Sequence, residues 1–226
     1  YTYEGIKLNG SFVDSILFAN LRYEDENLDF DINTNADLNA DNSSLVLNGN
    51  INEINLLKLN LSPDSIILST EMHANIKNLD LDSLNGFFRL SNTSLIEGAI
   101  KYDLDTFQIR AATGDTIRSI YLDSDFIDAE LKGRFSFVDM PLMVDNFIDY
   151  YFTTSTDTIN FAPSQYLILD MVIKDEPMLV KAFMPDLILP QASNISLSYY
   201  ADEHNLAVNV NIPEVHYMDY RVRALE

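Results

Sequence analysis

The chain alternates between apolar and polar residues through most of its interior, and this alternation constrains its fold more than any other feature. In the stretch 28–38, every second position holds an apolar or small residue: Leu28, Phe30, Ile32, Thr34, Ala36 and Leu38. Aspartate and asparagine fill the positions between them. The same period returns at 43–54, 65–78, 94–104, 123–137 and 205–212. Because successive side chains of a strand point to opposite faces, the pattern predicts many strands with one apolar and one polar face.

Turn-forming residues separate these alternating runs at short intervals. They occur at Asn39-Ala40-Asp41-Asn42, Ser62-Pro63-Asp64, Asn85-Gly86 and Gly114-Asp115. Asparagine, aspartate, proline and glycine each favour turn conformations. Short strands joined by such turns are typical of antiparallel sheets. The sequence therefore predicts a mostly β protein built as a long antiparallel meander.

One short amphipathic helix is predicted near 140–152. Its apolar residues recur with helical spacing: Met140, Met143, Val144, Phe147, Ile148 and Tyr151. Asp139 can cap its N-terminus, and Pro141 falls in the first turn, where a missing N–H is tolerated. We expect the apolar stripe of this helix to cap the sheet.

The helix and the polar loop after it divide the chain into blocks. We expect a β block at 1–137, the helix and loop at 138–159, and a continuing β block at 160–226. The chain starts at Tyr1 without an initiator methionine or a signal peptide. We therefore expect it to be a segment of a longer protein.

The composition excludes several classes of function. The 226 residues carry a formal net charge of −21, which repels the phosphates of nucleic acids. The chain has no cysteine, so thiol nucleophiles, disulfides and thiolate metal sites are excluded. Its wholly apolar runs are too short for a membrane-spanning helix.

The sequence predicts neither an enzyme nor a metal or cofactor site. It has no nucleophile elbow, phosphate loop or dinucleotide fingerprint. His73, His204 and His216 do not have the spacing of metal ligands. The acidic groups Asp80/Asp82 and Asp123/Asp125/Asp128 lack a calcium-loop pattern. Paired carboxylates could serve a glycosidase, but the absence of tryptophan removes the usual sugar-stacking platform.

A short repeat leads to a family resemblance. Residues 51–59 align with residues 76–84, with aliphatic residues at four matching positions (51/76, 54/79, 56/81 and 59/84). The phrase at 76–84, followed by Leu95 and Gly98, resembles a recurring phrase of the AsmA-like superfamily, particularly of TamB-type proteins. Residues 124–135, followed by the predicted helix, are also similar to a TamB-like segment.

The resemblance implies a fold, a location and a set of partners. TamB-type proteins are anchored in the inner membrane and cross the periplasm of diderm bacteria. Their antiparallel sheet curls into an open U-shaped groove, a β-taco, with an apolar interior. The resemblance implies that such a groove carries phospholipid acyl chains between the inner and outer membranes, or assists outer-membrane protein assembly. It also implies an Omp85-class outer-membrane barrel as a partner, contacted through segments absent from this chain.

The predicted lipid-binding residues are those that alternation places on the inward apolar face. They are Phe30, Ile32, Leu45, Leu47, Leu68, Met72, Ile76, Ile127, Leu131 and Phe135. An open curled sheet can hold acyl chains on such a face. In the alternative, these residues pack against each other inside a closed β-sandwich, and the chain is an interaction or adhesion module without lipid. Open sheet edges also predict edge-to-edge self-association of this segment.

Overall fold

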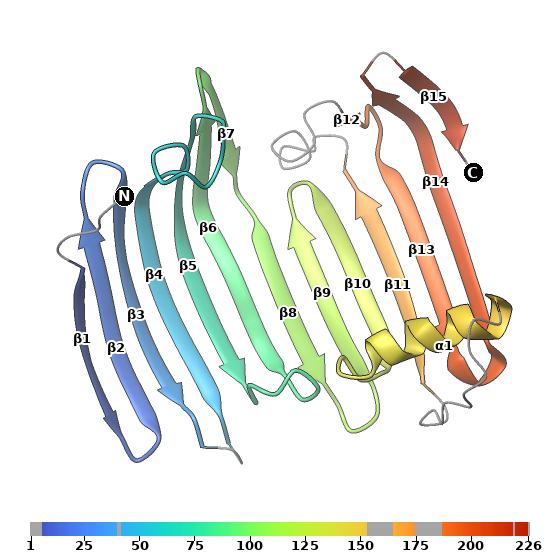
Figure 1. Ribbon diagram of the computed structural model, residues 1–226, viewed down its shortest axis with the longest axis horizontal. Coiled ribbons are helices and arrows are strands. Elements are labelled where there is room, and N and C mark those ends of the chain that lie inside the picture. Colours follow the sequence, from blue (N-terminus) through green and yellow to red (C-terminus); the bar gives the residue numbers. More distant parts are fainter. Residues whose placement is uncertain (1–5, 40–41, 153–164, 175–186, 219, 226) are drawn as a thin grey trace. The chain divides into compact units, whose positions relative to one another are not determined.

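The computed structural model describes residues 6–39, 42–152, 165–174, 187–218 and 220–225 (Figure 1). Nearly all of its regular structure is antiparallel strand. The strands are β1 (Lys7–Val13), β2 (Ile16–Glu24), β3 (Leu28–Asp37), β4 (Ser44–Asn55), β5 (Ile66–Lys77), β6 (Asn85–Glu97), β7 (Ile100–Leu104), β8 (Phe107–Thr113), β9 (Arg118–Ser124), β10 (Ile127–Arg134), β11 (Tyr166–Ile173), β12 (Leu187–Ile188), β13 (Ser193–Tyr200), β14 (Asn205–Tyr217) and β15 (Tyr220–Leu225). The helices are α1 (Met140–Phe152) and a short 3-10 helix, η1 (Ala201–Glu203).

The chain forms two compact units, and the boundary between them falls inside β8. The first unit contains the described residues up to Asp80 and Leu84–Arg110. The second contains Leu81–Ser83 and the described residues from Ala111 onward. The blocks drawn around the helix, at 1–137, 138–159 and 160–226, remain a prediction. These blocks are defined by the position of the predicted helix in the sequence, whereas the two units are the parts of the chain that pack compactly in space.

The first unit is a simple antiparallel meander. Strands β1 to β6 are neighbours in the order in which they occur in the sequence, β7 folds back on the end of β6, and β8 follows β6 in the strand order. Register shifts interrupt the ladders at Asp29/Phe30, between Ile51 and Ile54, and between Ser69 and Glu71. Such irregularities bend strands and increase their local twist.

The second unit continues the antiparallel pattern around a helix. Its strand order is β9-β10-β11-β13-β14, and both β12 and β15 pair with β14. Helix α1 lies in the connection between β10 and β11, two strands that pair directly. It lies across one end of β11, β13 and β14 (Figure 1).

The predicted fold class is confirmed: the protein is mostly antiparallel β, its sheet is open, and its one α-helix among the described residues is short. The helix begins at Met140, directly after the predicted cap. The Asp139 carbonyl accepts a hydrogen bond from Met143 N at 2.9 Å, as expected of an N-cap residue. This helix is too short to cross a bilayer, and the described residues contain no membrane-spanning helix.

Two local predictions are wrong. The run 94–104 is not one strand, because Gly98 adopts a φ of 60° and turns the chain from β6 into β7. The Asn85-Gly86 pair is not a turn between strands, since both residues begin β6. Gly86 is required there for a different reason. A Cβ at this position would lie 2.0 Å from the carbonyl oxygen of Asn75.

Candidate apolar binding faces

The first unit presents one continuous apolar face across strands β2 to β6. Directly opposed residues of an antiparallel pair lie on the same face of the sheet. One cross-strand row therefore joins Leu21, Ile32, Gly49, Met72 and Leu90. Neighbouring rows add further apolar side chains: Leu17, Tyr23, Phe30, Ala36, Leu45, Leu47, Ile51, Ala74, Ile76 and Phe88. We call this surface the first apolar face.

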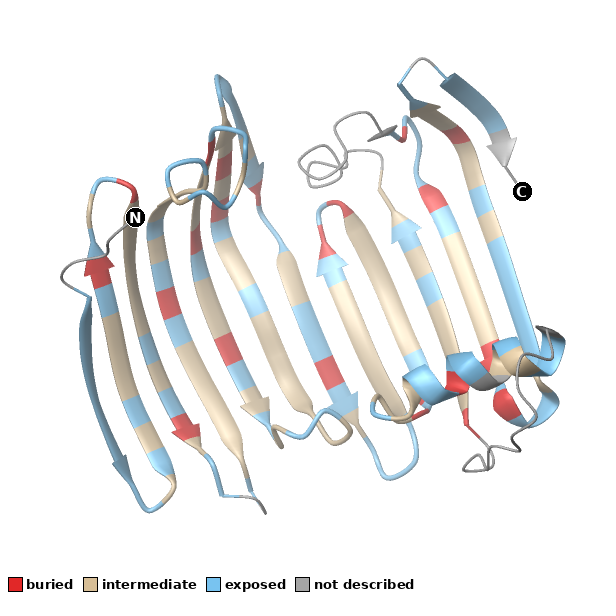
Figure 2. Ribbon diagram, in the orientation of Figure 1, coloured by how far each residue is buried: buried red, intermediate tan, exposed pale blue. Residues whose placement is uncertain are grey.

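The structure places the predicted residues of the first unit together on this face. They are Phe30, Ile32, Leu45, Leu47, Leu68, Met72 and Ile76, and all of them are half-buried (Figure 2). Gly49 lies between Ile32 and Met72, and a Cβ there would approach Met72 Cε to 2.8 Å. The glycine thus leaves room for the Met72 side chain within the face. That these residues touch a ligand stays a prediction.

The second unit has its own apolar face, on strands β9, β10, β11, β13 and β14. One row joins Ile120, Leu131, Leu169, Leu197 and Val208. Adjacent rows add Leu122, Ile127, Ala129, Leu167, Met171, Ile173, Ile195, Tyr199, Leu206 and Val210. We call this surface the second apolar face. It contains the predicted residues Ile127 and Leu131.

Phe135, the last predicted residue, lies outside the strands. It follows the end of β10 and is only 1% exposed. Its ring packs edge-to-face against Phe137, with ring centroids 5.2 Å apart, and the Arg118 guanidinium lies 5.9 Å from its centre. Phe135 is therefore enclosed by protein groups, in contrast to the other predicted residues, which are half-buried.

Helix α1 covers one end of the second apolar face. Met143 is 3% exposed and forms a buried cluster with Tyr199 and Ala201. Phe147 packs against the same cluster, and its ring meets that of Tyr199 edge-on, with centroids 5.8 Å apart. Ile148 and the predicted stripe residue Tyr151 are largely exposed instead. The helix thus contacts the sheet through a narrower stripe than the sequence pattern indicates.

The C-terminal half of α1 is fixed to the connection between β13 and β14. The Tyr151 hydroxyl donates a hydrogen bond of 2.8 Å to the carbonyl of His204. The Tyr150 ring stacks on the His204 imidazole, with centroids 4.0 Å apart. His204 itself adopts a left-handed conformation with a φ of 47°. These contacts with Tyr150 and Tyr151 give His204 a structural role, which is to hold the C-terminal half of α1.

A cavity remains between the helix and the sheet. Its volume is about 260 Å³. The lining consists of four residues of α1 and four of the second apolar face: Met140, Met143, Val144, Phe147, Leu167, Leu197, Tyr199 and Leu206. We call it the α1 cavity. The hydroxyl of Tyr199 is buried and has no hydrogen-bond partner among the described residues, and its burial raises the pKa of the phenol.

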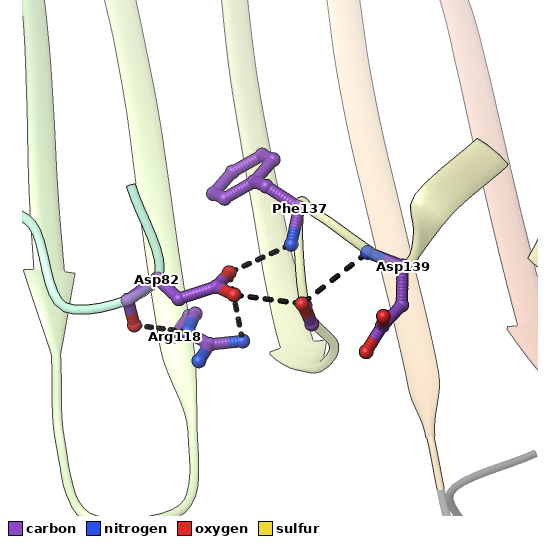
Figure 3. A network of polar contacts seen from close by, with 5 residues as sticks. Asp82, Arg118, Phe137 and Asp139 are labelled. Carbon is purple, nitrogen blue, oxygen red and sulfur yellow. Dashed lines mark hydrogen bonds and ion pairs between the residues drawn. The ribbon is translucent and has the colours of Figure 1, made fainter. Parts of the chain in front are cut away.

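The start of α1 is held by a polar network centred on Asp82 (Figure 3). The Asp82 carboxylate accepts hydrogen bonds of 2.7 Å from Ser136 Oγ and from Phe137 N. Arg118 lies 3.6 Å from this carboxylate, and its Nε donates to the Asp82 carbonyl at 2.7 Å. Burial alone would raise the pKa of Asp82, but the hydrogen bonds from Ser136 and Phe137 and the charge of Arg118 outweigh it and lower the pKa.

The opposite face of the first unit is polar and internally hydrogen-bonded. Asn20 Nδ2 donates to Asp31 and to Asn33, at 2.7 and 2.9 Å. His73 Nδ1 and Asn48 Oδ1 are 2.6 Å apart. Within the described parts of the chain, no group of three or more acidic or histidine side chains has the arrangement of a metal site. These contacts are typical of a solvated sheet surface.

Sequence reasoning missed the α1 cavity and the Asp82 network. Alternation in β13 could have placed Tyr199 on the apolar side, because it is in step with Ile195 and Leu197. Nothing in the sequence relates Asp82 to Phe137, which is 55 residues further along the chain.

Comparisons with known proteins give no match: no family model, no curated protein and no solved structure is similar to this chain.

Proposed function

We propose that this chain is a segment of a TamB/AsmA-like protein that holds or conducts phospholipid acyl chains between two membranes. The observation that carries the proposal is the pair of apolar faces, each built from consecutive antiparallel strands within its own unit. Holding an acyl chain requires no chemistry, only an apolar surface shielded from water. Each methylene removed from water contributes about 0.8 kcal/mol, so an acyl chain with about ten buried methylenes contributes roughly 8 kcal/mol before the cost of association.

The single strand order of each unit supports this proposal over a closed sandwich. A sandwich packs two sheets face to face and encloses the inner side chains between them. In the described residues of the first unit, strands β1 to β6 form a single sheet in which each strand is hydrogen-bonded to the next. The buried cluster of Met143, Tyr199 and Ala201 lies under α1, in the second unit. Tyr23, Ala36 and Ala74 are buried, and the other apolar side chains named for the first apolar face are half-buried, which supports access of an apolar ligand to this face.

The location and the protein partners belong to the same proposal. The chain would act in the periplasm of a diderm bacterium, as part of an inner-membrane-anchored protein. An Omp85-class outer-membrane barrel would be contacted through other segments, and assistance to outer-membrane protein assembly is the related role. The net charge of −21 supports a partner other than nucleic acid.

The proposal is tested by lipid retention in matched variants. Leu47 lies on the first apolar face, and its neighbour Asn48 lies on the polar face of the same strand. In Leu47→Asp, a carboxylate would enter the acyl-chain path, so we expect the purified protein to carry much less phospholipid, measured by mass spectrometry of extracts. Asn48→Asp should retain the wild-type amount. Equal lipid in the two variants, with both folded by circular dichroism, would contradict the proposal.

A further inference from the structure

The α1 cavity presents only apolar surface to its interior. Its lining consists of aliphatic, methionine and aromatic side chains from α1 and from strands β11, β13 and β14. Tyr199 contributes its ring to this surface but not its hydroxyl. Removing a polar group from water without giving it a hydrogen-bond partner is unfavourable. The cavity therefore accepts a hydrocarbon group and disfavours an ester, a carboxylate or a phosphate.

The cavity is also large enough to hold part of a hydrocarbon chain. An apolar cavity of about 150 Å³ stays free of water and binds benzene, and the α1 cavity measures about 260 Å³. Met140 and Met143 form part of its helix wall, and the flexible methionine side chain adapts to ligands of different shapes. A flexible alkyl segment is therefore a suitable occupant.

The second apolar face leads directly into this cavity. The cross-strand row of Leu167, Tyr199 and Leu206 belongs to that face and forms most of the sheet wall of the cavity. Successive rows follow away from α1 at intervals of two residues, which is about 7 Å along a strand. On β11, β13 and β14 these rows are Leu169, Leu197 and Val208, and then Met171, Ile195 and Val210. An alkyl chain that lies on these rows can thus continue into the cavity without leaving apolar surface.

We infer that the α1 cavity binds the methyl end of an acyl chain, and that the ester end points away from α1 along β11, β13 and β14. The inference rests on the proposed function, because it gives a direction to an acyl chain on the second apolar face. The opposite direction would place the polar ester against the wholly apolar lining of the cavity. Helix α1 is then the wall that encloses the hydrocarbon end of the ligand.

Isotope-filtered NMR of the full chain with methyl-labelled methionine tests this direction without any substitution. The probe is dodecanoyl-lysophosphatidylcholine, a single-chain phospholipid, used below its micelle concentration. Met143 reports from the cavity, and Met171 lies four residues beyond Leu167 on β11, about 14 Å further from α1. We expect the terminal methyl group of the ligand to give a nuclear Overhauser effect to Met143. The methylene next to the carbonyl should give one to Met171 and none to Met143.

A matched pair of variants tests whether the ligand occupies the cavity itself. Val144 lines the cavity and is exposed, so Val144→Trp fills part of the cavity from the helix surface. Asp145→Trp adds the same side chain at the next exposed position, which does not line the cavity. Each methylene excluded from an apolar site weakens binding about fourfold. Val144→Trp should therefore weaken binding of the lysolipid by about fourfold or more, and Asp145→Trp should bind it as the wild type does.

Three outcomes would overturn the inference. The first is the absence of an Overhauser effect between the terminal methyl group and Met143 at saturating lysolipid, as expected if another protein segment fills the cavity. The second is a stronger effect on Met143 from the methylene next to the carbonyl. The third is equal affinity of Val144→Trp and Asp145→Trp, both folded by circular dichroism. The first two are measured on the unsubstituted protein, so a folding defect in a variant cannot produce them.

Failure of the inference is distinguishable from failure of the proposed function. Leu47 and Asn48 lie in the first unit, away from the α1 cavity. If Leu47→Asp and Asn48→Asp still differ in retained phospholipid, only the assignment of the cavity fails. If they do not differ, the proposed function fails as well.

Discussion

At the residue scale, Asp82 has the clearest structural role. It belongs to a short connection after β5, yet it binds the segment between β10 and α1 through Ser136 and Phe137. Ser136 Oγ also accepts a hydrogen bond of 3.3 Å from Asp139 N, the residue before the helix (Figure 3). Asp82 therefore fixes the position at which α1 begins.

Replacing Asp82 by asparagine should destabilise the second unit by about 1 to 3 kcal/mol, because half-buried donors lose a charged acceptor. The pKa of Asp82 is lowered in the folded state from its ordinary value of 3.8. Its contribution is therefore present above about pH 4 and is lost as the pH falls through the lower, folded-state pKa. Urea unfolding at several pH values should give a smaller acid-induced loss of stability in Asp82→Asn than in the wild type.

Asp64→Asn is the matched control, because Asp64 is exposed in the connection between β4 and β5. It should follow the wild-type pH dependence. If the unfolding free energies of Asp82→Asn and the wild type fell by the same amount as the pH is lowered, the role assigned to Asp82 would be contradicted.

At the element scale, α1 is held to the sheet by a few side chains. Met143 is buried against Tyr199, whereas its neighbour Val144 is 56% exposed. Met143→Ala should cost about 2 to 5 kcal/mol of unfolding free energy, since it removes packed atoms from the buried cluster under α1. Val144→Ala should cost less than about 1 kcal/mol. Chemical denaturation of the two variants measures the difference, and similar losses would mean that α1 is not packed as described.

The β14–β15 hairpin depends on one buried acid. Glu214 accepts hydrogen bonds from Arg221 and from His216, and Arg223 lies 3.7 Å away. The hydrogen bonds from Arg221 and His216 lower the pKa of Glu214 from 4.5 to about 2. Its stabilising contribution is therefore present above about pH 4.5 and is lost as the pH falls towards 2.

Glu214→Gln should weaken this hairpin selectively. Amide hydrogen exchange in β15 should be faster in the variant than in the wild type at pH 6, and exchange in β10 should be unchanged. As the pH falls towards 2, the protection of β15 in the two proteins should converge. Glu203→Gln, at an exposed position of η1, is the control and should leave β15 unaffected. If the exchange protection of β15 were the same in Glu214→Gln as in the wild type, Glu214 would not stabilise the β14–β15 hairpin.

At the scale of the whole molecule, the sequence predicts the faces better than it predicts the helix contacts. Alternation placed Ile32 and Met72 on one face because antiparallel register keeps opposed residues on the same side. It could not separate Phe135 from that set, since the burial of Phe135 comes from contacts with Phe137 and Arg118 that lie beyond the end of β10. The α1 cavity could not be predicted from the sequence either, because it forms only when α1 packs on strands that follow it in the chain.

The most direct test of acyl-chain binding is site-specific photo-crosslinking in cells that express the full-length protein. Ile127 and Leu131 lie on the second apolar face, and Glu130 lies between them on the opposite face, paired with Asp170. Photoreactive residues at 127 and 131 should form phospholipid adducts, and one at 130 should not. Absence of lipid at all three positions in a folded protein, or equal labelling at all three, would contradict the account.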